Sequence, residues 1–371
     1  MKTNAAILWA VNEKWSVEEI ELDPPRDGEV LVEFEATGLC HSDHHMRTGD
    51  MYGVTLPIIG GHEGAGVVQE VGPEVRDLAV GDHVVTSFLP ACGRCRWCAS
   101  GHQNLCDFGA NTLLGTQPDG TYRRRARGEE IGVLSGVGCF SRYSTVSEAS
   151  VIKIDDDVPL SRACLLGCGV TTGWGSAVNT ADVRPGDTVV VVGFGGIGSG
   201  AVQGARLAGA EHIVVVELRE GKREKAIQFG GTHFVTSIKE ATGLVAELTR
   251  GVMADSVILT PGVLEGTMIE GAIWIVRKGG AVVVTALASM EDVTPTLPLT
   301  MFTLFQKRLL GSLYGEANPR ADIPKLVNLY RNGQLLLDET VTTEYRLDDI
   351  NQGYDDMLAG RNIRGVIIHG R

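Results

Sequence analysis

The chain has 371 residues, of which 43% are hydrophobic, and this length predicts two domains because one hydrophobic core rarely serves so many residues. The formal net charge of -13 argues against a nucleic-acid partner, since phosphate binding draws on clustered Lys and Arg. The sequence starts without the apolar core of a signal peptide and contains no run long enough for a membrane helix. We therefore expect a cytoplasmic protein with no membrane partner.

From residue 5 to about 90, short stretches of alternating hydrophobic and polar residues are separated by Gly, Pro and Asp. Residues 29–35 and 64–71 are examples of this pattern, which is typical of half-buried strands. The N-terminal part is therefore predicted to be rich in β-structure.

The pattern changes after residues 183–187, where apolar strands begin to alternate with helical stretches. Strands are predicted at 188–192, 212–216, 256–259 and 281–285, with a Gly/Ala-rich helix at about 196–208. Such alternation predicts an α/β fold in which a parallel sheet is doubly wound, with helices on both faces.

The C-terminal part is expected to rejoin the first domain. It contains an amphipathic stretch at 324–330 and an apolar strand at 364–369. The predicted organisation is a catalytic domain at 1–169, a dinucleotide-binding domain at 170–313 and a return to the catalytic domain at 314–371.

One basic run stands out in this acidic chain: Arg123, Arg124, Arg125 and Arg127. Charge runs are usually solvated, so we predict an exposed loop here, with binding of an anionic group as the minor alternative.

Four cysteines lie close together in the sequence: Cys92, Cys95, Cys98 and Cys106. A folded-back loop of this length can arrange four thiolates tetrahedrally around Zn²⁺. Four protein ligands leave no open position, so this site, within a lobe at about 90–110, is predicted to be structural. Unrelated buried thiols or an iron–sulfur cluster are the alternatives.

Cys40, His62 and Cys168 are candidates for a second, open zinc site, because a Cys₂His set with a free fourth position is one form of catalytic zinc. Taken singly, each residue would more often be a buried thiol or a satisfied core histidine. Zinc in such a site acts as a Lewis acid that lowers the pKa of an alcohol. Glu63 would then tune the metal.

An alcohol proton released in a water-excluding site needs a way out. Ser42 and His45 could provide it by transfer from hydroxyl to imidazole. The alternative makes Ser42 a helix cap and His45 a surface residue.

A glycine-rich segment, Gly193-Phe194-Gly195-Gly196-Ile197-Gly198, follows a strand and opens a helix. This context predicts that backbone N–H groups receive a dinucleotide pyrophosphate. Glu217 ends the next strand, where a carboxylate accepts from the adenosine ribose hydroxyls and repels a 2′-phosphate. NAD is therefore preferred over NADP, although Arg219 could soften this preference.

Taken together, these residues resemble the zinc-containing alcohol dehydrogenases of the medium-chain dehydrogenase/reductase superfamily over essentially the whole chain. The resemblance rests on residues 60–66, the four-cysteine lobe, Gly167-Cys168-Gly169 and the glycine-rich segment. It implies a GroES-like catalytic domain, a Rossmann domain, NAD and two Zn²⁺ per subunit.

Position by position, the resemblance assigns a role to most of these residues. It implies that Cys40, His62 and Cys168 hold the catalytic zinc, that Cys92, Cys95, Cys98 and Cys106 hold the structural zinc, and that Ser42 and His45 relay the proton. It also implies His41 and Arg364 near the pyrophosphate, Thr172 beside the nicotinamide, Lys222 near the ribose, and Phe88 and Leu134 in the substrate channel.

Residues 92–98, 101–106 and 171–180 further resemble actinobacterial nitroso-dimethylaniline (NDMA)-dependent alcohol dehydrogenases. These are nicotinoproteins, which retain NAD and regenerate it with an electron acceptor. The long segment between Cys106 and Phe140 is similar to that of dimeric animal-type enzymes, so a homo-oligomer, preferably a dimer, is expected.

The predicted activity is the interconversion of primary alcohols and aldehydes by hydride transfer with NAD. The rival enzyme is a thiol-dependent formaldehyde dehydrogenase or an aldehyde dismutase on the same fold. A non-catalytic dinucleotide-binding protein is the alternative of another class, but it would have no use for an open metal site and a proton exit.

Overall fold

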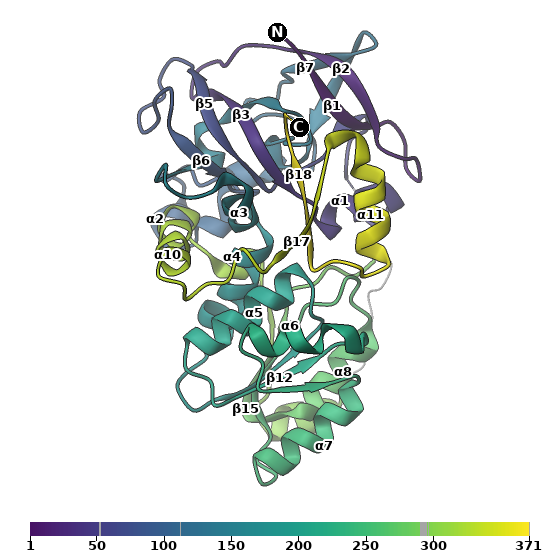
Figure 1. Cartoon of the computed structure of the whole chain (residues 1–371). Helices are drawn as coiled ribbons and strands as arrows, with labels where there is room; N and C mark the ends of the chain where they lie inside the picture. Colours follow the sequence, from purple (N-terminus) through teal and green to yellow (C-terminus); the bar gives the residue numbers. More distant parts are fainter. Residues whose placement is uncertain (52, 112, 290–294, 296, 371) are drawn as a thin grey trace. The chain divides into compact units, whose positions relative to one another are not determined.

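The computed structural model describes residues 1–51, 53–111, 113–289, 295 and 297–370. The chain divides into two compact units: unit 1 consists of Met1–Cys168 and Asn318–Arg371, and unit 2 consists of Gly169–Ala317. The end of the chain, yellow in Figure 1, thus belongs to the same unit as its beginning. None of the described helices is long and apolar enough to cross a membrane.

A small closed barrel forms one part of unit 1. Its strands, in order around the barrel, are β1 (Lys2–Leu8), β2 (Ser16–Leu22), β7 (Arg124–Ala126), β8 (Glu129–Val133) and β4 (Ile58–Ile59). In β2 the alternation of the sequence buries Ile20 and Leu22 and leaves the glutamates outside. The interior is closed by aromatic rings, with Trp15 5.4 Å from Phe140 and 6.2 Å from Tyr354.

A second sheet of unit 1 brings the two ends of the chain together. Its order is β10 (Val151–Ile154), β6 (His83–Thr86), β5 (Gly64–Val71), β3 (Glu29–Gly38), β18 (Arg364–Ile368) and β17 (Val341–Tyr345), with β9 (Tyr143–Ser147) also paired to β3. Strand β18 runs antiparallel to β3, with Ile367 opposite Thr37. The strands predicted at 29–35, 64–71 and 364–369 are confirmed.

Short helices connect the strands of unit 1. They are α1 (His41–Thr48), α2 (Arg96–Ala99), α3 (Leu160–Ala163), α10 (Pro319–Arg331) and α11 (Ile350–Leu358). The purely β-type interpretation of residues 5–90 missed α1, whose sequence HSDHHMRT is polar. Helical periodicity of apolar residues, the usual signal, is absent from that segment.

The prediction of a solvated loop at the basic run was wrong for Arg123 and Arg124, whereas Arg127 is exposed in a turn and Arg125 is partly exposed. Arg123 and Arg124 are 1% and 2% exposed, and Arg124 opens strand β7. Arg123 donates to both carboxylate oxygens of Glu29, at 2.9 and 2.7 Å, and also pairs with Asp119. Burial lowers the pKa of Arg124 to about 9, and its guanidinium donates to the carbonyl of Thr145 at 2.6 Å. Internal partners, not solvent, therefore satisfy these two cations.

Unit 2 is the doubly wound parallel sheet that the sequence predicts. The strand order is β13 (His233–Val235), β12 (His212–Val216), β11 (Thr188–Val192), β14 (Ala254–Leu259), β15 (Val276–Val284) and β16 (Arg308–Gly311), all parallel. The short edge strands β13 and β16 were not predicted. The central strand TVVVV is buried along its whole length, as expected where helices cover both faces.

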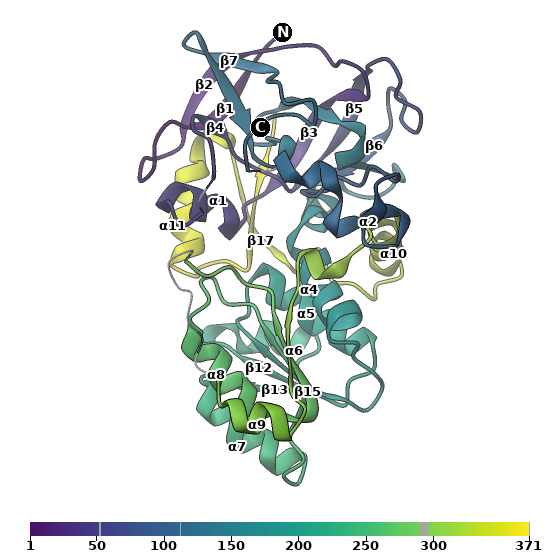
Figure 2. The same cartoon turned by 180° about the vertical axis from the view of Figure 1, so that it is seen from behind.

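The helices of unit 2 lie on both faces of this sheet (Figures 1 and 2). They are α4 (Gly169–Gly175), α5 (Gly196–Leu207), α6 (Arg223–Gln228), α7 (Ile238–Leu248), α8 (Gly266–Ile275) and α9 (Leu299–Leu304). Buried residues of α7 and α8, such as Val245 and Ile273, pack with Val190 and Val257 of the central strands in one core.

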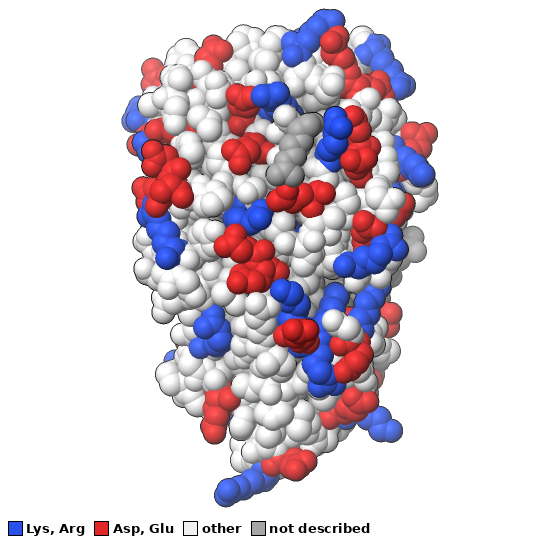
Figure 3. All heavy atoms as spheres, in the orientation of Figure 1, with Lys and Arg blue, Asp and Glu red and all other residues white. Residues whose placement is uncertain are grey.

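On the face shown in Figure 3, Lys and Arg side chains are interspersed with Asp and Glu. Ion pairs near the surface include Arg331 with Asp155, at 2.5 Å, and Arg162 with Asp338, at 3.1 Å. Exposed pairs of this kind contribute at most about 1 kcal/mol each, so the fold depends mainly on the buried cores.

His369 fastens the end of the chain just after strand β18. Its Nε2 lies 3.1 Å from the carbonyl oxygen of Cys139 and 3.1 Å from Thr37 Oγ1. Because the carbonyl only accepts, Nε2 carries the proton and the ring is held in its neutral form. Burial lowers the pKa of His369 from 6.5 to about 4.

This shift predicts a loss of stability in acid. Between pH 6.5 and 4 the unfolded chain takes up a proton at His369 that the folded chain does not, so the free energy of unfolding falls as the pH falls. Since the side chain is partly exposed, we expect a contribution of about 2 kcal/mol at most. Denaturant unfolding from pH 7 to 4 should show a smaller pH dependence in His369→Gln than in wild type. Equal slopes would contradict the assignment, and His102→Gln, at an exposed position, serves as the control.

Candidate functional site

The four predicted ligands of the lobe do converge. In the four-cysteine lobe, Sγ of Cys92 lies 4.0 Å from Sγ of Cys98, and Sγ of Cys95 lies 4.0 Å from Sγ of Cys106. Four thiolates bound tetrahedrally at about 2.3 Å from Zn²⁺ would be about 3.8 Å apart, so the donor set fits this metal.

Backbone N–H groups turn toward the sulfur atoms of the lobe. Cys95 N and Cys98 N donate to Sγ of Cys92 and Cys95, at 3.4 and 3.5 Å, and Cys92 N donates to Cys106 Sγ at 3.4 Å. The N–H groups of Cys98 and Asp107 lower the pKa of Cys95 to about 6. The local fold thus favours a thiolate at Cys95, which is the form that binds metal. Burial raises the pKa of Cys98, and it raises that of Cys106 to about 12, so these two thiols would need the bound cation itself to lose their protons.

The second predicted set also converges, although its members come from distant segments. Ligand atoms of Cys40, His62, Glu63 and Cys168 all lie within 4.8 Å of one another, and all four residues are buried. Cys40 precedes α1, His62 and Glu63 precede β5, and Cys168 precedes α4. The Cys168 thiol donates to Cys40, which places the pKa of Cys40 well below and that of Cys168 well above the ordinary value.

His62 is oriented by a fully buried carboxylate, Asp43. Asp43 Oδ2 lies 3.4 Å from His62 Nδ1, and Oδ1 accepts from Gly61 N at 2.7 Å. Burial opposes a charged imidazole, but Asp43 and Cys40 together hold the pKa of His62 well above its usual range. With Nδ1 engaged by Asp43, Nε2 is the nitrogen left for a metal.

Glu63 forms a buried ion pair with Arg364, the first residue of β18. Arg364 also donates to the carbonyl of Leu39 at 3.0 Å, which fixes the backbone next to Cys40. Burial raises the pKa of Glu63, and the Arg364 guanidinium opposes this rise. A Cβ at position 38 would collide with the Glu63 carboxylate, so a larger residue there would displace the carboxylate from its present position.

The predicted relay residues lie on α1. Ser42 Oγ is 3.6 Å from Cys40 Sγ, and His45, 3% exposed, has its Nδ1 3.2 Å from Asp50 Oδ2. His41 opens the same helix, with its ring 5.0 Å from that of His45, and burial lowers the pKa of His41.

The two predicted substrate residues differ in their surroundings. The ring of Phe88 lies 5.8 Å from that of His62, next to the candidate ligands. Leu134 is 3% exposed and belongs to the hydrophobic core of the barrel. That Phe88 and Leu134 line a substrate channel remains a prediction.

In unit 2 the glycine-rich segment has the geometry of a phosphate-binding turn. Gly193 has φ +95°, which favours glycine, and α5 begins at Gly196 and continues through Ile197. A Cβ at Gly198 would collide with the carbonyl of Gly193, whereas the space around Gly195 is open. Backbone N–H groups at the start of α5 are thus available to an anion.

Glu217 and Lys222 both reach this turn. Glu217 Oε2 accepts from Phe194 N at 2.9 Å, and Lys222 Nζ donates to the carbonyl of Phe194 at 3.0 Å. Burial lowers the pKa of Lys222, and its Nζ lies 3.6 Å from the Glu217 carboxylate. In α4, the buried Thr172 has an Oγ1 without a hydrogen-bond partner, as expected of a group that meets a ligand. These residues fit a dinucleotide.

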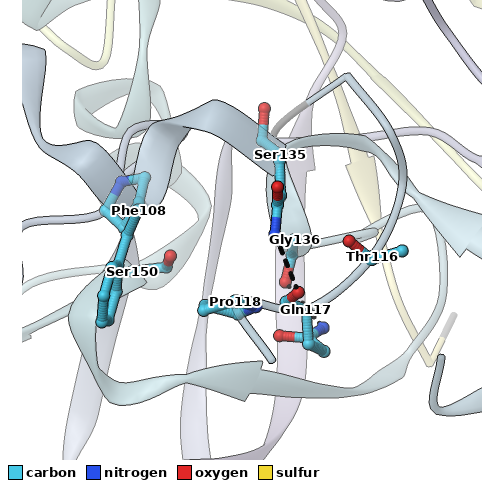
Figure 4. A pocket seen from close by; sticks show the side chains of 9 residues that line it. Phe108, Thr116, Gln117, Pro118, Ser135, Gly136 and Ser150 are labelled. Carbon is cyan, nitrogen blue, oxygen red and sulfur yellow. Dashed lines mark hydrogen bonds between the residues drawn. The ribbon is translucent and has the colours of Figure 1, made fainter. Parts of the chain in front are cut away.

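Two cavities lie away from these groups. One, of about 10 Å³, is lined by Phe108, Gln117, Ser135 and Gly136 among others (Figure 4) and holds one water molecule at most. The other, of about 350 Å³, lies at Thr188 and Asp255, where strands β11 and β14 begin, opposite the glycine turn. Neither cavity is where an alcohol would meet the candidate ligands.

A sulfur-rich open ligand set, a closed Cys₄ set and a dinucleotide-binding sheet define a metal-dependent, dinucleotide-linked oxidoreductase. Comparison with known proteins agrees. Residues 26–156 match the model of the alcohol dehydrogenase GroES-like domain, and residues 196–332 match that of the zinc-binding dehydrogenases.

Similar proteins cover the whole chain. Alcohol dehydrogenase B of Mycobacterium tuberculosis is 52% identical, over 99% of this chain and 98% of its own. The NDMA-dependent alcohol dehydrogenase of Amycolatopsis methanolica is 49% identical, over 100% and 99%. The crystal structure of benzyl alcohol dehydrogenase from Acinetobacter calcoaceticus, 29% identical, matches with a TM-score of 0.92 over 99% of each chain.

The chain therefore belongs to the zinc-containing alcohol dehydrogenases of the medium-chain dehydrogenase family. It is an enzyme with NAD and zinc as cofactors, acts on small molecules, and has the GroES-like and Rossmann folds expected from its sequence.

Sequence reasoning missed two residues that shape this site, Asp43 and Thr86. Thr86 Oγ1 donates to the carbonyl of His62 at 2.9 Å and accepts from Gly64 N at 2.8 Å, so it clamps the His62–Glu63 turn from strand β6. The position of Asp43 three residues after Cys40 was the one local signal for its role.

Loss of one ligand in the four-cysteine lobe should lower the stability of the protein more than its catalytic activity. In Cys98→Ser we expect one zinc fewer per chain and a melting temperature lower by about 5–10 °C, because metal binding contributes to folding. Calorimetry and metal analysis provide the measurement, and a chelator should lower the wild-type melting temperature in the same direction. An unchanged melting temperature would count against a structural metal.

Proposed function

We propose that this enzyme interconverts primary alcohols and aldehydes at the site formed by Cys40, His62 and Cys168. The observation that carries the proposal is the convergence of these three buried side chains, with Ser42 beside Cys40 and the ring of Phe88 near His62. Phe88 and Leu134 would offer an apolar wall to aliphatic or aromatic alcohols. Such a wall distinguishes only weakly between alcohols that differ in the length of their carbon chain.

The three ligands would hold zinc with one position open to substrate, and the four-cysteine lobe would hold a closed, structural zinc. When bound, zinc supplies Lewis acidity toward the alcohol oxygen and NAD supplies the hydride acceptor. Two thiolates balance the charge of the cation, and Asp43 keeps His62 in the tautomer that leaves Nε2 free.

Within this chain, Ser42 would accept the alcohol proton and pass it toward His45. The hydroxyl of Ser42 is 3.6 Å from Cys40 Sγ and therefore lies at the edge of the ligand set. Glu63 would tune the metal site through its charge, which the buried pair with Arg364 keeps at a fixed position.

On the cofactor side, the turn at Gly193, Gly195, Gly196, Ile197 and Gly198 would receive the pyrophosphate. Glu217 would accept from the ribose hydroxyls and select NAD over NADP, with Lys222 beside it. His41 and Arg364 would contribute positive or hydrogen-bonding groups to the pyrophosphate; Arg364 Nε is buried without a protein partner. Thr172 Oγ1 would meet the nicotinamide.

We further propose that NAD stays bound during turnover and is regenerated by an electron acceptor. The support is the likeness to the NDMA-dependent alcohol dehydrogenase of Amycolatopsis methanolica, which extends over the whole chain. A homodimer is the proposed assembly. Strand β16 is the edge of the unit 2 sheet, and Trp274, Leu299, Leu304 and Leu313 of unit 2 are exposed, which suits association with a second copy.

The eight cysteines are all free thiols in the structure, which supports a reducing, cytoplasmic location. Thiols that serve as metal ligands would be at risk of oxidation elsewhere.

Cys168→Ser tests the proposed catalytic metal. Serine is a poor zinc ligand, so we expect the loss of one zinc per chain and at least about a 100-fold drop in kcat/KM for alcohols, with an unchanged circular dichroism spectrum. Cys164→Ser is the matched control, because Cys164 is a buried thiol of the same segment outside both ligand sets. Full activity in Cys168→Ser, or its failure to fold when Cys164→Ser folds, would contradict the assignment.

Native mass spectrometry of the purified enzyme tests cofactor retention and assembly together. We expect a dimer that carries two zinc ions and one NAD per chain through gel filtration. The same sample should oxidise an alcohol with a dye acceptor and no added NAD. Protein free of dinucleotide with ordinary NAD kinetics would refute retention, and strict dependence on a thiol cofactor would favour a formaldehyde dehydrogenase instead.

A further inference from the structure

The proton route that begins at Ser42 and His45 has an unassigned outer end. His45 lies on α1 with its side chain 4% exposed, so a proton that reaches its ring is still inside unit 1. Asp50 lies just beyond the end of the helix, and its side chain is 36% exposed. The carboxylate oxygen Oδ2 is 3.2 Å from His45 Nδ1. Asp50 therefore contacts both the buried imidazole and solvent.

The backbone holds this pair together. Helix α1 ends at Gly49, which has a left-handed conformation, and the turn brings Asp50 N to within 3.0 Å of the His45 carbonyl. Thr48 Oγ1 donates to the same carboxylate oxygen at 2.5 Å. These contacts position Asp50 Oδ2 opposite one ring nitrogen of His45.

The titratable groups around His45 and Asp50 are two further histidines, an arginine and a tyrosine. His41 and His44 lie on the same helix as His45, Arg47 is near the helix end, and Tyr354 of α11 stacks on His44 at 6.3 Å. The hydrogen bond from Thr48 is the main cause that lowers the pKa of Asp50, and His45 adds to it. Asp50 is thus an anion at neutral pH and accepts a hydrogen bond from Nδ1–H.

We propose that Asp50 is a positioning residue of the proton route: it fixes His45 as the Nδ1–H tautomer and passes the released proton to water. This inference rests on the proposed function. With Nδ1 protonated, Nε2 is the basic nitrogen and accepts the proton that comes from the alcohol by way of Ser42. The imidazolium then gives its Nδ1 proton to Asp50, whose exposed carboxylate gives it to water, and a half-turn of the ring brings the remaining N–H back to Asp50 for the next turnover.

The first test reads the tautomer without reference to activity. In protein labelled with ¹⁵N-histidine, the wild-type spectrum should show Nδ1 of His45 protonated and Nε2 unprotonated near neutral pH, with the signal assigned by its absence from His45→Gln. In Asp50→Asn we expect a mixture of both tautomers or a shift of Nδ1, because the charged acceptor is lost. An identical His45 signal in wild type and Asp50→Asn would overturn the proposal.

The second test is the pH profile of kcat/KM for alcohol oxidation. Asp50→Asn should lose about tenfold or more of kcat/KM at the plateau, because the amide neither fixes the Nδ1–H tautomer of His45 nor takes up its proton. Asp50→Glu should restore most of the rate. Asp348→Asn, which removes an equal charge from an exposed position of unit 1, should keep the wild-type profile.

A structural role alone would lower the melting temperature and would leave the tautomer of His45 unchanged. A wild-type plateau of kcat/KM in Asp50→Asn therefore contradicts the proposal. If wild type itself oxidises no alcohol with NAD or with a dye, the proposed function fails, and the ¹⁵N spectrum still decides whether Asp50 sets the tautomer of His45.

Discussion

The meeting of Cys40, His62 and Cys168 at one buried point of unit 1 is the constraint on which the chemistry depends. Two thiolates and an imidazole would not stay together in a low-dielectric interior without a cation and without supporting contacts. The support is visible: Asp43 engages His62, Thr86 clamps its backbone, and the pair of Glu63 and Arg364 lies behind Cys40. These contacts position the three side chains within unit 1, and a bound cation would complete the site.

This arrangement also explains why the end of the chain must return to the first unit. Arg364 is the first residue of β18, and that strand pairs with β3, which leads directly to Cys40. Without the C-terminal segment, Glu63 would be a buried carboxylate without its cation, and the backbone at Leu39 would lose its partner. The discontinuous domain is thus required by the site as much as by the barrel.

Local patterns in the sequence predicted a large part of this fold and site, whereas long-range contacts did not. The parallel sheet, the glycine turn and the four-cysteine lobe follow from spacing within a short segment. The burial of Arg123 could not be predicted, because its partner Glu29 lies 94 residues away and belongs to another strand. The convergence of Cys40, His62 and Cys168 was predicted from the family resemblance alone, because no local sequence pattern shows that three distant segments come together. The sequence analysis missed Asp43 and Asp50. A carboxylate can orient a histidine only if the fold brings the two side chains into contact, and the sequence does not show that contact.

Helix α1 joins the metal side and the proton side of the site in eight residues. Cys40 precedes its first turn, Asp43 points to His62 and Gly61, and His45 meets Asp50 beyond the last turn. Because Asp43 contacts both Gly61 N and His62 Nδ1, in the segment that carries a ligand, the helix has little freedom to rotate about its axis. The orientation of His45 is therefore fixed from one end by the ligand scaffold and from the other by Asp50. This polar helix is held in its β-rich region by these contacts together with the burial of a single apolar side chain, Met46, in the core of the barrel.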